Sequence, residues 1–147
     1  AMCEATVAAF EQADIAILCA AVADFTPCTT ADKKIKKQPG QEGMVVELKT
    51  TTDIAAMLGA RSKEQGGKIV VGFALETHDE QANALRKLQS KNLDMIVLNS
   101  LQDQGAGFGT DTNKVTLLFA DGTKKDLPLL LKQEVADVIV ESILQLI

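Results

Sequence analysis

Three short apolar runs along the chain have the length and near-continuous hydrophobicity of strands that are buried on both faces. They are DIAILCAAVA (residues 14–23), KIVVGFALE (68–76) and LDMIVLN (93–99). Runs of this kind are typical of the parallel strands of α/β proteins, whereas strands with one solvated face alternate apolar and polar residues. We therefore expect a mostly parallel sheet.

Segments with helical character separate these runs, at residues 2–12, 50–67 and 77–92, and another at 132–147 closes the chain. The second begins near Thr and Asp residues suited to an N-cap and stops at Gly66-Gly67. In the third, Thr77 and Glu80 have capping-box spacing. Strands that alternate with helices predict an α/β, Rossmann-like fold with helices on both faces of the sheet.

Two further features complete the expected architecture. Residues 26–43 form a long polar excursion that holds two prolines and two glycines, and MVVELK (44–49) returns from it as a strand. Long loops inside compact domains are often functional. Near the C-terminus, residues 114–129 contain an Asp121-Gly122 turn between two strand-like runs, which predicts a β-hairpin.

Composition narrows the class of protein. The 147 residues, 46% hydrophobic and 24% charged, suit a single globular domain. No run approaches the roughly 20 apolar residues of a membrane span, and acidic residues near the N-terminus argue against a signal peptide, so we expect a cytoplasmic protein. Cys3, Cys19 and Cys28 lack zinc or redox spacing. A net charge of −5 with no Trp or Tyr argues against nucleic-acid binding.

Polar side chains stand at the carboxyl ends of the three predicted strands. They are Asp24, Glu76 with Thr77, and Asn99. In open parallel sheets ligands bind at this edge, so the three positions together indicate a site. Each of them taken alone would be explained equally well as a helix cap or the start of a loop.

Lysines are the candidate anion ligands. Lys87 and Lys91 are four residues apart on one predicted helix, where like charges repel unless something negative lies against them. Lys33, Lys34, Lys36 and Lys37 lie in the polar excursion. A solvated surface would explain both groups without a ligand. The chain lacks the glycine-rich dinucleotide and P-loop motifs. The only histidine, His78, is expected to be exposed, and Cys19 to pack in its strand.

The ordered set of motifs resembles phosphopantothenoylcysteine synthetase, the CTP-dependent half of the bacterial bifunctional coenzyme A biosynthetic flavoprotein. The match covers essentially the whole chain, through AAVADFTP, KIKK, LKTTTDI, VGFALET, KLQSKNLDMIVLN, GFGTDTNKV and LLLKQEVADVI. The resemblance implies a ligase. The carboxylate of 4'-phosphopantothenate attacks the α-phosphate of CTP, giving an acyl-cytidylate and pyrophosphate, and the amine of cysteine then displaces CMP. Mg²⁺ would assist, at a site the motifs leave unknown.

The resemblance also implies residue roles. Ala20, Ala21 and Asp24 would line the nucleotide, and Asp24 would read polar groups of the cytidine. Lys34 would neutralise phosphate charge from a mobile loop and is the candidate catalytic residue. The base pocket would involve Thr52 and Asp53, with Phe73 packed on the cytosine. Lys87 and Lys91 would bind the triphosphate. Asn99 belongs to a recurrent motif without an assigned contact.

One departure separates this chain from the family pattern. The family domain begins with an earlier strand, a Gly-rich loop and an asparagine that holds the acyl-cytidylate, and nothing here matches them. The chain is therefore expected to be an N-terminally truncated synthetase-like domain over residues 1–147. The resemblance further implies a homodimer, with residues 32–49 and the hairpin as contacts, and a flavin-binding decarboxylase domain in the full-length protein. A nucleotide-binding fragment without turnover and a Rossmann-like interaction domain are the alternatives.

Overall fold

The computed structural model describes residues 1–37, 39–100 and 109–147. Contacts along the chain divide it into two compact units. The sheet unit comprises Ala1–Cys19 and Ile54–Ile147, and the insert comprises Ala20–Asp53. The insert coincides with the polar excursion and its flanks, so the segment that stands out in sequence forms a unit of its own.

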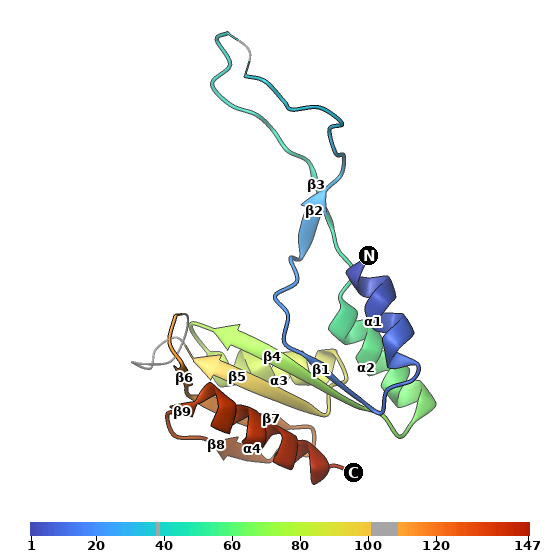
Figure 1. The fold of residues 1–147 in the computed structure, drawn as a ribbon, viewed down its shortest axis with the longest axis vertical. Helices are drawn as coiled ribbons and strands as arrows, with labels where there is room; N and C mark the ends of the chain where they lie inside the picture. The colour runs from blue at the N-terminus through green and yellow to red at the C-terminus, as the bar shows by residue number, and fades with distance from the viewer. Residues whose placement is uncertain (38, 101–108) are drawn as a thin grey trace. The chain divides into compact units, whose positions relative to one another are not determined.

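A five-stranded sheet organises the sheet unit (Figure 1). Its order is β1-β4-β5-β7-β8, with bounds Ile15–Leu18, Ile69–Glu76, Met95–Ser100, Val115–Phe119 and Lys124–Asp126. The pairs β1–β4 and β4–β5 are parallel, while β7 and β8 form the predicted hairpin and add to β5 antiparallel. Short strands β6 (Thr112–Asn113) and β9 (Leu130–Leu131) pair separately. The structure confirms the predicted α/β class and its hairpin.

Helices cover both faces of the sheet, as expected from the alternation. On one face α1 (Met2–Phe10), α2 (Ile54–Gln65) and α3 (Glu80–Ser90) pack around fully buried residues such as Leu58, Val70 and Ala84. On the other face α4 (Lys132–Leu144) packs over Met95, Val97 and Leu117. Figure 1 shows α4 crossing in front of the sheet and α3 behind it. Burial of these side chains from both sides is the main stabilising term of the sheet unit.

The sequence predicted where α2 ends and how α3 is capped, and the structure tests both predictions. Helix α2 stops at Gly66 and Gly67, whose φ angles of 71° and 72° are left-handed, so the predicted stop is confirmed. The predicted capping box of α3 is wrong. Asp79, with φ 47°, is the N-cap and Glu80 is the first helical residue rather than the third. The chain adopts a left-handed φ at Asp79, so the helix begins two residues later than the spacing of Thr77 and Glu80 predicts.

The first predicted strand is too long. Only Ile15–Leu18 pairs with β4, and β1 forms one edge of the sheet. Ile17 is 44% exposed, so the strand is not buried on both faces. Cys19 is exposed and does not pack as predicted. An apolar run shows that a segment can be buried, but it does not show whether a neighbour lies on each side.

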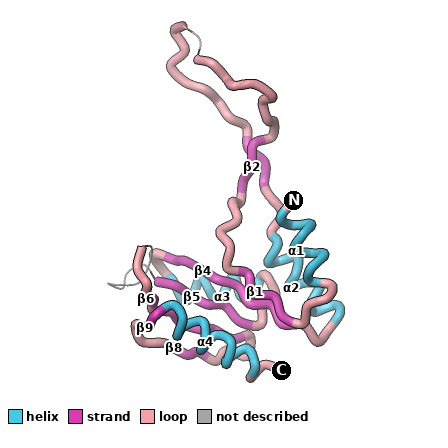
Figure 2. The backbone as a smooth tube through the Cα atoms, viewed as in Figure 1, coloured by secondary structure: helices cyan, strands magenta, loops and turns pink. Residues whose placement is uncertain are grey.

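In the insert, β2 (Phe25–Pro27) pairs antiparallel with β3 (Leu48–Thr50). The predicted strand 44–49 is shifted towards the C-terminus, because Met44, Val45 and Val46 precede β3 and are exposed. The described residues between the two strands run as loop (Figure 2). The long excursion predicted from its prolines and glycines is therefore confirmed.

Within the described ranges, none of the helices combines the length and apolarity needed to cross a membrane.

Candidate functional site

The predicted site residues fall into two groups, one in each unit. In the insert, Thr51 organises the first group. Its backbone N–H donates to the carbonyl of Asp24 at 2.9 Å, and its hydroxyl donates to the carbonyl of Ala23 at 2.6 Å. These two bonds extend the β2–β3 ladder by one step and hold Asp24 beside the segment that continues to Thr52 and Asp53. Asp24 thus lies against Thr51, the residue before Thr52, although Asp24 and Thr52 are 28 residues apart in the sequence.

Asp24 keeps an exposed side chain in this arrangement, while its backbone is fixed. Asp24 was predicted to stand at the carboxyl end of the first strand, but it does not. Asp24 directly precedes β2, and β1 already ends at Leu18. Ala20 and Ala21 lie in the irregular segment between these strands and are exposed.

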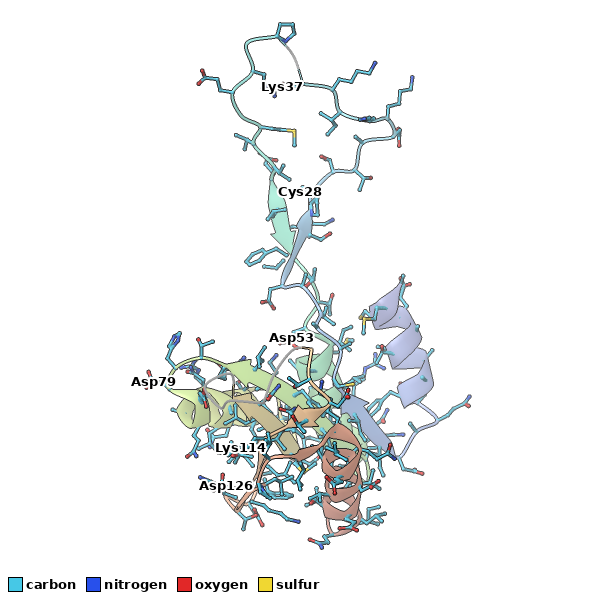
Figure 3. The ribbon with its side chains drawn as sticks, turned by 60° about the vertical axis from the view of Figure 1, so that its left-hand side comes forward. Cys28, Lys37, Asp53, Asp79, Lys114 and Asp126 are labelled. Carbon is cyan, nitrogen blue, oxygen red and sulfur yellow. The ribbon has the colours of Figure 1, made fainter. Side chains whose placement is uncertain are left out.

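Asp53 closes the insert directly before α2, where the sequence analysis expected a helix start (Figure 3). Lys34 lies in the loop between β2 and β3, with an exposed side chain. A surface hollow of about 350 Å³ in the same loop is lined by its neighbours Ile35 and Lys36, but not by Lys34. None of the predicted nucleotide ligands lines this hollow, so it does not mark the site.

In the sheet unit, Phe73 stands on β4 and is 40% exposed. Side chains alternate along a strand, so Phe73 shares a face with Val71, which packs in the cluster under α4. Leu75, two residues further along this face, is 42% exposed. The side chain of Phe73 therefore leaves part of its apolar surface exposed on this face of the sheet.

Lys87 reaches back from the last turn of α3 to the carboxyl end of β4. Its Nζ lies 2.6 Å from Oε1 of Glu76, the last residue of that strand. Glu76 supplies the negative group that the sequence analysis required to offset repulsion between Lys87 and Lys91. A triphosphate is therefore not needed to explain the tolerance of that pair. Lys91 is the C-cap of α3, where a cation is favoured by the helix dipole.

Asn99 occupies the carboxyl end of β5, beside Leu75 of β4. Its Oδ1 is buried and has no hydrogen-bond partner among the described residues. His78 is exposed as predicted, and its Nδ1 lies 2.9 Å from the hydroxyl of Thr77. An exposed imidazole without a neighbouring thiol offers no nucleophilic pair.

The pKa shifts resolved in the described part of the chain lie on the C-terminal hairpin, away from these residues. Hydrogen bonds from the hydroxyl and backbone N–H of Thr123 lower the pKa of Asp121. The Thr116 hydroxyl, and then Lys124, lower the pKa of Asp126 on β8 (Figure 3). Both carboxylates stabilise the hairpin turn and its strand pairing rather than a site.

Two contacts near the predicted site residues could not be predicted from the sequence. Thr51 was one of three consecutive threonines, and nothing in the sequence distinguished the one that holds Asp24. Glu76 was named as a strand-end carboxylate, but its pairing with Lys87 depends on how α3 packs on β4. Gly107 and Phe108 of the GFGTDTNKV motif lie outside the described residues. Within those residues, no three His, Cys, Asp or Glu side chains gather as ligands for a metal ion.

Comparison with known proteins identifies the family of this chain. The family model of the DNA/pantothenate metabolism flavoprotein C-terminal domain matches residues 1–147. A crystal structure of the C-terminal domain of the coenzyme A biosynthesis bifunctional protein CoaBC is similar, with a TM-score of 0.74 and 37% identity, over 99% of this chain and 62% of that one. A DNA/pantothenate metabolism flavoprotein from Streptococcus pneumoniae has a TM-score of 0.73 at 17% identity, which supports the fold alone.

Curated relatives carry two different names. The bifunctional protein CoaBC of Bacillus subtilis (strain 168) is 51% identical over 97% of this chain. A protein from an unknown prokaryotic organism, named cysteine/cysteine sulfinic acid decarboxylase, is 55% identical over 99% of it. The chain spans only 34% and 40% of these two proteins, respectively. The activities in these two names therefore belong to proteins that extend well beyond the part this chain matches.

Proposed function

Since the chain belongs to the family of the DNA/pantothenate metabolism flavoprotein C-terminal domain, we propose that it is the CTP-dependent synthetase part of a coenzyme A biosynthesis enzyme. In this proposal it joins 4'-phosphopantothenate to cysteine through an acyl-cytidylate. The observation that supports the proposal is the pair of bonds from Thr51, which hold Ala23 and Asp24 against the residue that directly precedes Thr52 and Asp53. The resemblance assigns Asp24, Thr52 and Asp53 to one nucleotide, and the bonds from Thr51 keep Asp24 next to the segment that leads into the other two.

The chemistry requires alignment and charge neutralisation rather than a covalent enzyme intermediate. A carboxylate oxygen of phosphopantothenate bonds to the α-phosphorus of CTP and pyrophosphate leaves. The amine of cysteine then bonds to the acyl carbon, CMP leaves, and the amine loses a proton. Both steps bring anions together, so fixed positive groups lower the barrier.

We assign the roles accordingly. In the insert, Lys34 neutralises charge at the reacting phosphate, and the nucleotide is lined by Ala20, Ala21, Asp24, Thr52 and Asp53. In the sheet unit, Phe73 packs on the cytosine while Lys87 and Lys91 bind the triphosphate. Mg²⁺ would be carried in with CTP, because this ion is usually held by phosphate oxygens with one or two carboxylates.

Two partners belong to the same proposal. A second copy of the chain would cover exposed apolar side chains of the insert, including Ile35, Met44 and Val45, which are 63%, 58% and 92% exposed. The hairpin would contribute to the same contact. A flavin-binding decarboxylase domain would accompany this domain in a longer protein, since the CoaBC relative is bifunctional by name.

Nucleotide-dependent thermal stability tests the proposal. We expect CTP to raise the melting temperature more than ATP, GTP or UTP, since a ligand at 100 times its Kd stabilises by about 2.7 kcal/mol. Phe73→Ala should weaken binding of CTP but not of pyrophosphate, which has no ring to pack against. Leu144→Ala, which truncates a 61% exposed side chain on α4, is the control and should change neither.

The outcomes separate the alternatives. Equal shifts for all four nucleotides would reduce the proposal to general phosphate binding, and no shift would favour an interaction domain. A CTP-specific shift without pyrophosphate release, in the presence of phosphopantothenate, cysteine and Mg²⁺, would indicate nucleotide binding without turnover.

A further inference from the structure

The ion pair between Glu76 and Lys87 joins a largely buried carboxylate to a half-exposed lysine, as does the pair between Asp94 and Lys63. The side chain of Glu76 is 13% exposed, whereas that of Lys87 is 41% exposed. In the pair between Glu11 and Arg61 both side chains are open to solvent, at 49% and 37%. Exposed pairs of that second kind contribute little, because each charge remains well solvated. The pair at the end of β4 instead couples an anchored anion to an accessible cation.

The positions of Glu76 and Lys87 are set by the sheet and by the packing of α3 on it. Glu76 is the last residue of β4 and pairs with Ser100 of β5, while on the other side of β4 the pairing with β1 ends at Gly72. Helix α3 is held against the sheet by Ala84 and Leu88, which are 0% and 3% exposed. Side chains on a helix lean towards its N-terminus, so Lys87 extends towards the strand end where Glu76 lies.

The geometry leaves Lys87 with capacity for a second anion. An ammonium group has three N–H donors, and the bond to Glu76 uses one of them. A lysine side chain without such a partner loses rotamer entropy when it binds a ligand. Tying its ammonium to a fixed carboxylate removes part of that cost in advance. The ammonium group of this half-exposed side chain is therefore already placed at the strand end where ligands bind in such sheets.

We propose that Glu76 is the positioning residue for Lys87, holding its ammonium where it meets a phosphate oxygen of the nucleoside triphosphate. The carboxylate acts only through Lys87 and does not touch the nucleotide. This inference rests on the proposed function and adds a residue to it. It also has an unusual consequence, since a negative side chain here strengthens the binding of an anion.

The proposal is tested by whether removing the negative charge of Glu76 weakens or strengthens the binding of an anion. Glu76→Gln keeps the shape of the side chain but removes one negative charge, so simple electrostatics predicts tighter binding of CTP and pyrophosphate. Positioning predicts weaker binding, by about tenfold, the scale of one hydrogen bond to a charged group. Glu11→Gln makes the same charge change in the exposed pair with Arg61 and should leave both affinities nearly unchanged.

A double-mutant cycle isolates the route through Lys87. We expect Lys87→Met to weaken both ligands by itself, and Glu76→Gln to have no further effect in that background. Affinities would be measured by calorimetry well below the melting temperature of each variant. If Glu76→Gln does not fold, Glu76→Asp replaces it in the same cycle, because a shorter carboxylate no longer reaches Lys87 equally well.

Two results would overturn the inference while leaving the proposed function intact. One is CTP binding by Glu76→Gln that equals or exceeds that of the wild type. The other is an equal loss with and without Lys87, which would mean that Glu76 serves the fold alone. Wild-type protein that fails to bind CTP would instead refute the proposed function itself.

Discussion

Replacing Gly59 by alanine should destabilise the protein, although alanine is the better helix former. Gly59 lies in the middle of α2 and is buried. A Cβ atom added there would lie 1.9 Å from the carbonyl oxygen of Lys91 and 3.0 Å from that of Asn92. The atoms in the way belong to the backbone, so no side chain can rotate to relieve the contact.

The structure sets the size of the effect. Restoring an ordinary contact of 3.4 Å requires α2 and the Lys91–Asn92 turn to separate by about 1.5 Å. That turn is held by bonds from the N–H groups of Lys91 and Leu93 to α3, at 3.0 Å each, and Asn92 has a left-handed φ of 53°. Overpacking of this kind costs about 1–3 kcal/mol, against a gain of about 1 kcal/mol in helix propensity. Because the obstacle is backbone, we expect a net loss of about 1–2 kcal/mol.

Urea unfolding followed by far-ultraviolet circular dichroism measures this loss, since the chain has no Trp or Tyr for fluorescence. The midpoint should fall with an unchanged slope. Ala60→Gly, at the exposed neighbouring position of α2, is the matched control and should cost about 1 kcal/mol through propensity alone. Opposite substitutions at adjacent positions should thus both destabilise. A Gly59→Ala variant as stable as the wild type would refute the close approach of α2 to this turn.

Two further predictions concern the hairpin and the insert. Because hydrogen bonds lower the pKa of Asp126 below its usual 3.8, its contribution to stability is present above that pH and is lost as the pH falls through the lowered pKa. The melting temperatures of the wild type and Asp126→Asn should therefore differ at pH 6, and the difference should shrink as the pH falls below 3.8; a constant difference would exclude this carboxylate as the cause. Replacing the 92% exposed Val45 by lysine should shift the proposed homodimer towards monomer in sedimentation velocity, while Ala60→Lys, on an exposed surface of the sheet unit, should not. Sedimentation as a monomer by both the wild type and the variant would rule out the dimer.

Much of the fold could be predicted because its signals are local. The stop of α2 at Gly66-Gly67, the Asp121-Gly122 turn and the long apolar run of β4 each depend on residues that are neighbours in sequence. The alternation of strands and helices then leaves few topologies for the central sheet. The order and type of the main elements, with the polar segment that became the insert, were therefore determined by the sequence.

The tertiary structure decided what depends on neighbours far along the chain. The apolar run at residues 14–23 forms a strand only where β4 lies beside it, so β1 ends at Leu18 and Asp24 belongs to the insert. Asp24 meets Thr51 only because β2 pairs with β3 in one particular register. Lys87 is paired with Glu76 rather than repelled by Lys91, because α3 packs on β4 with that lysine directed at the strand end. A sequence records the charge and size of each side chain, whereas the partner that each one meets is fixed by packing.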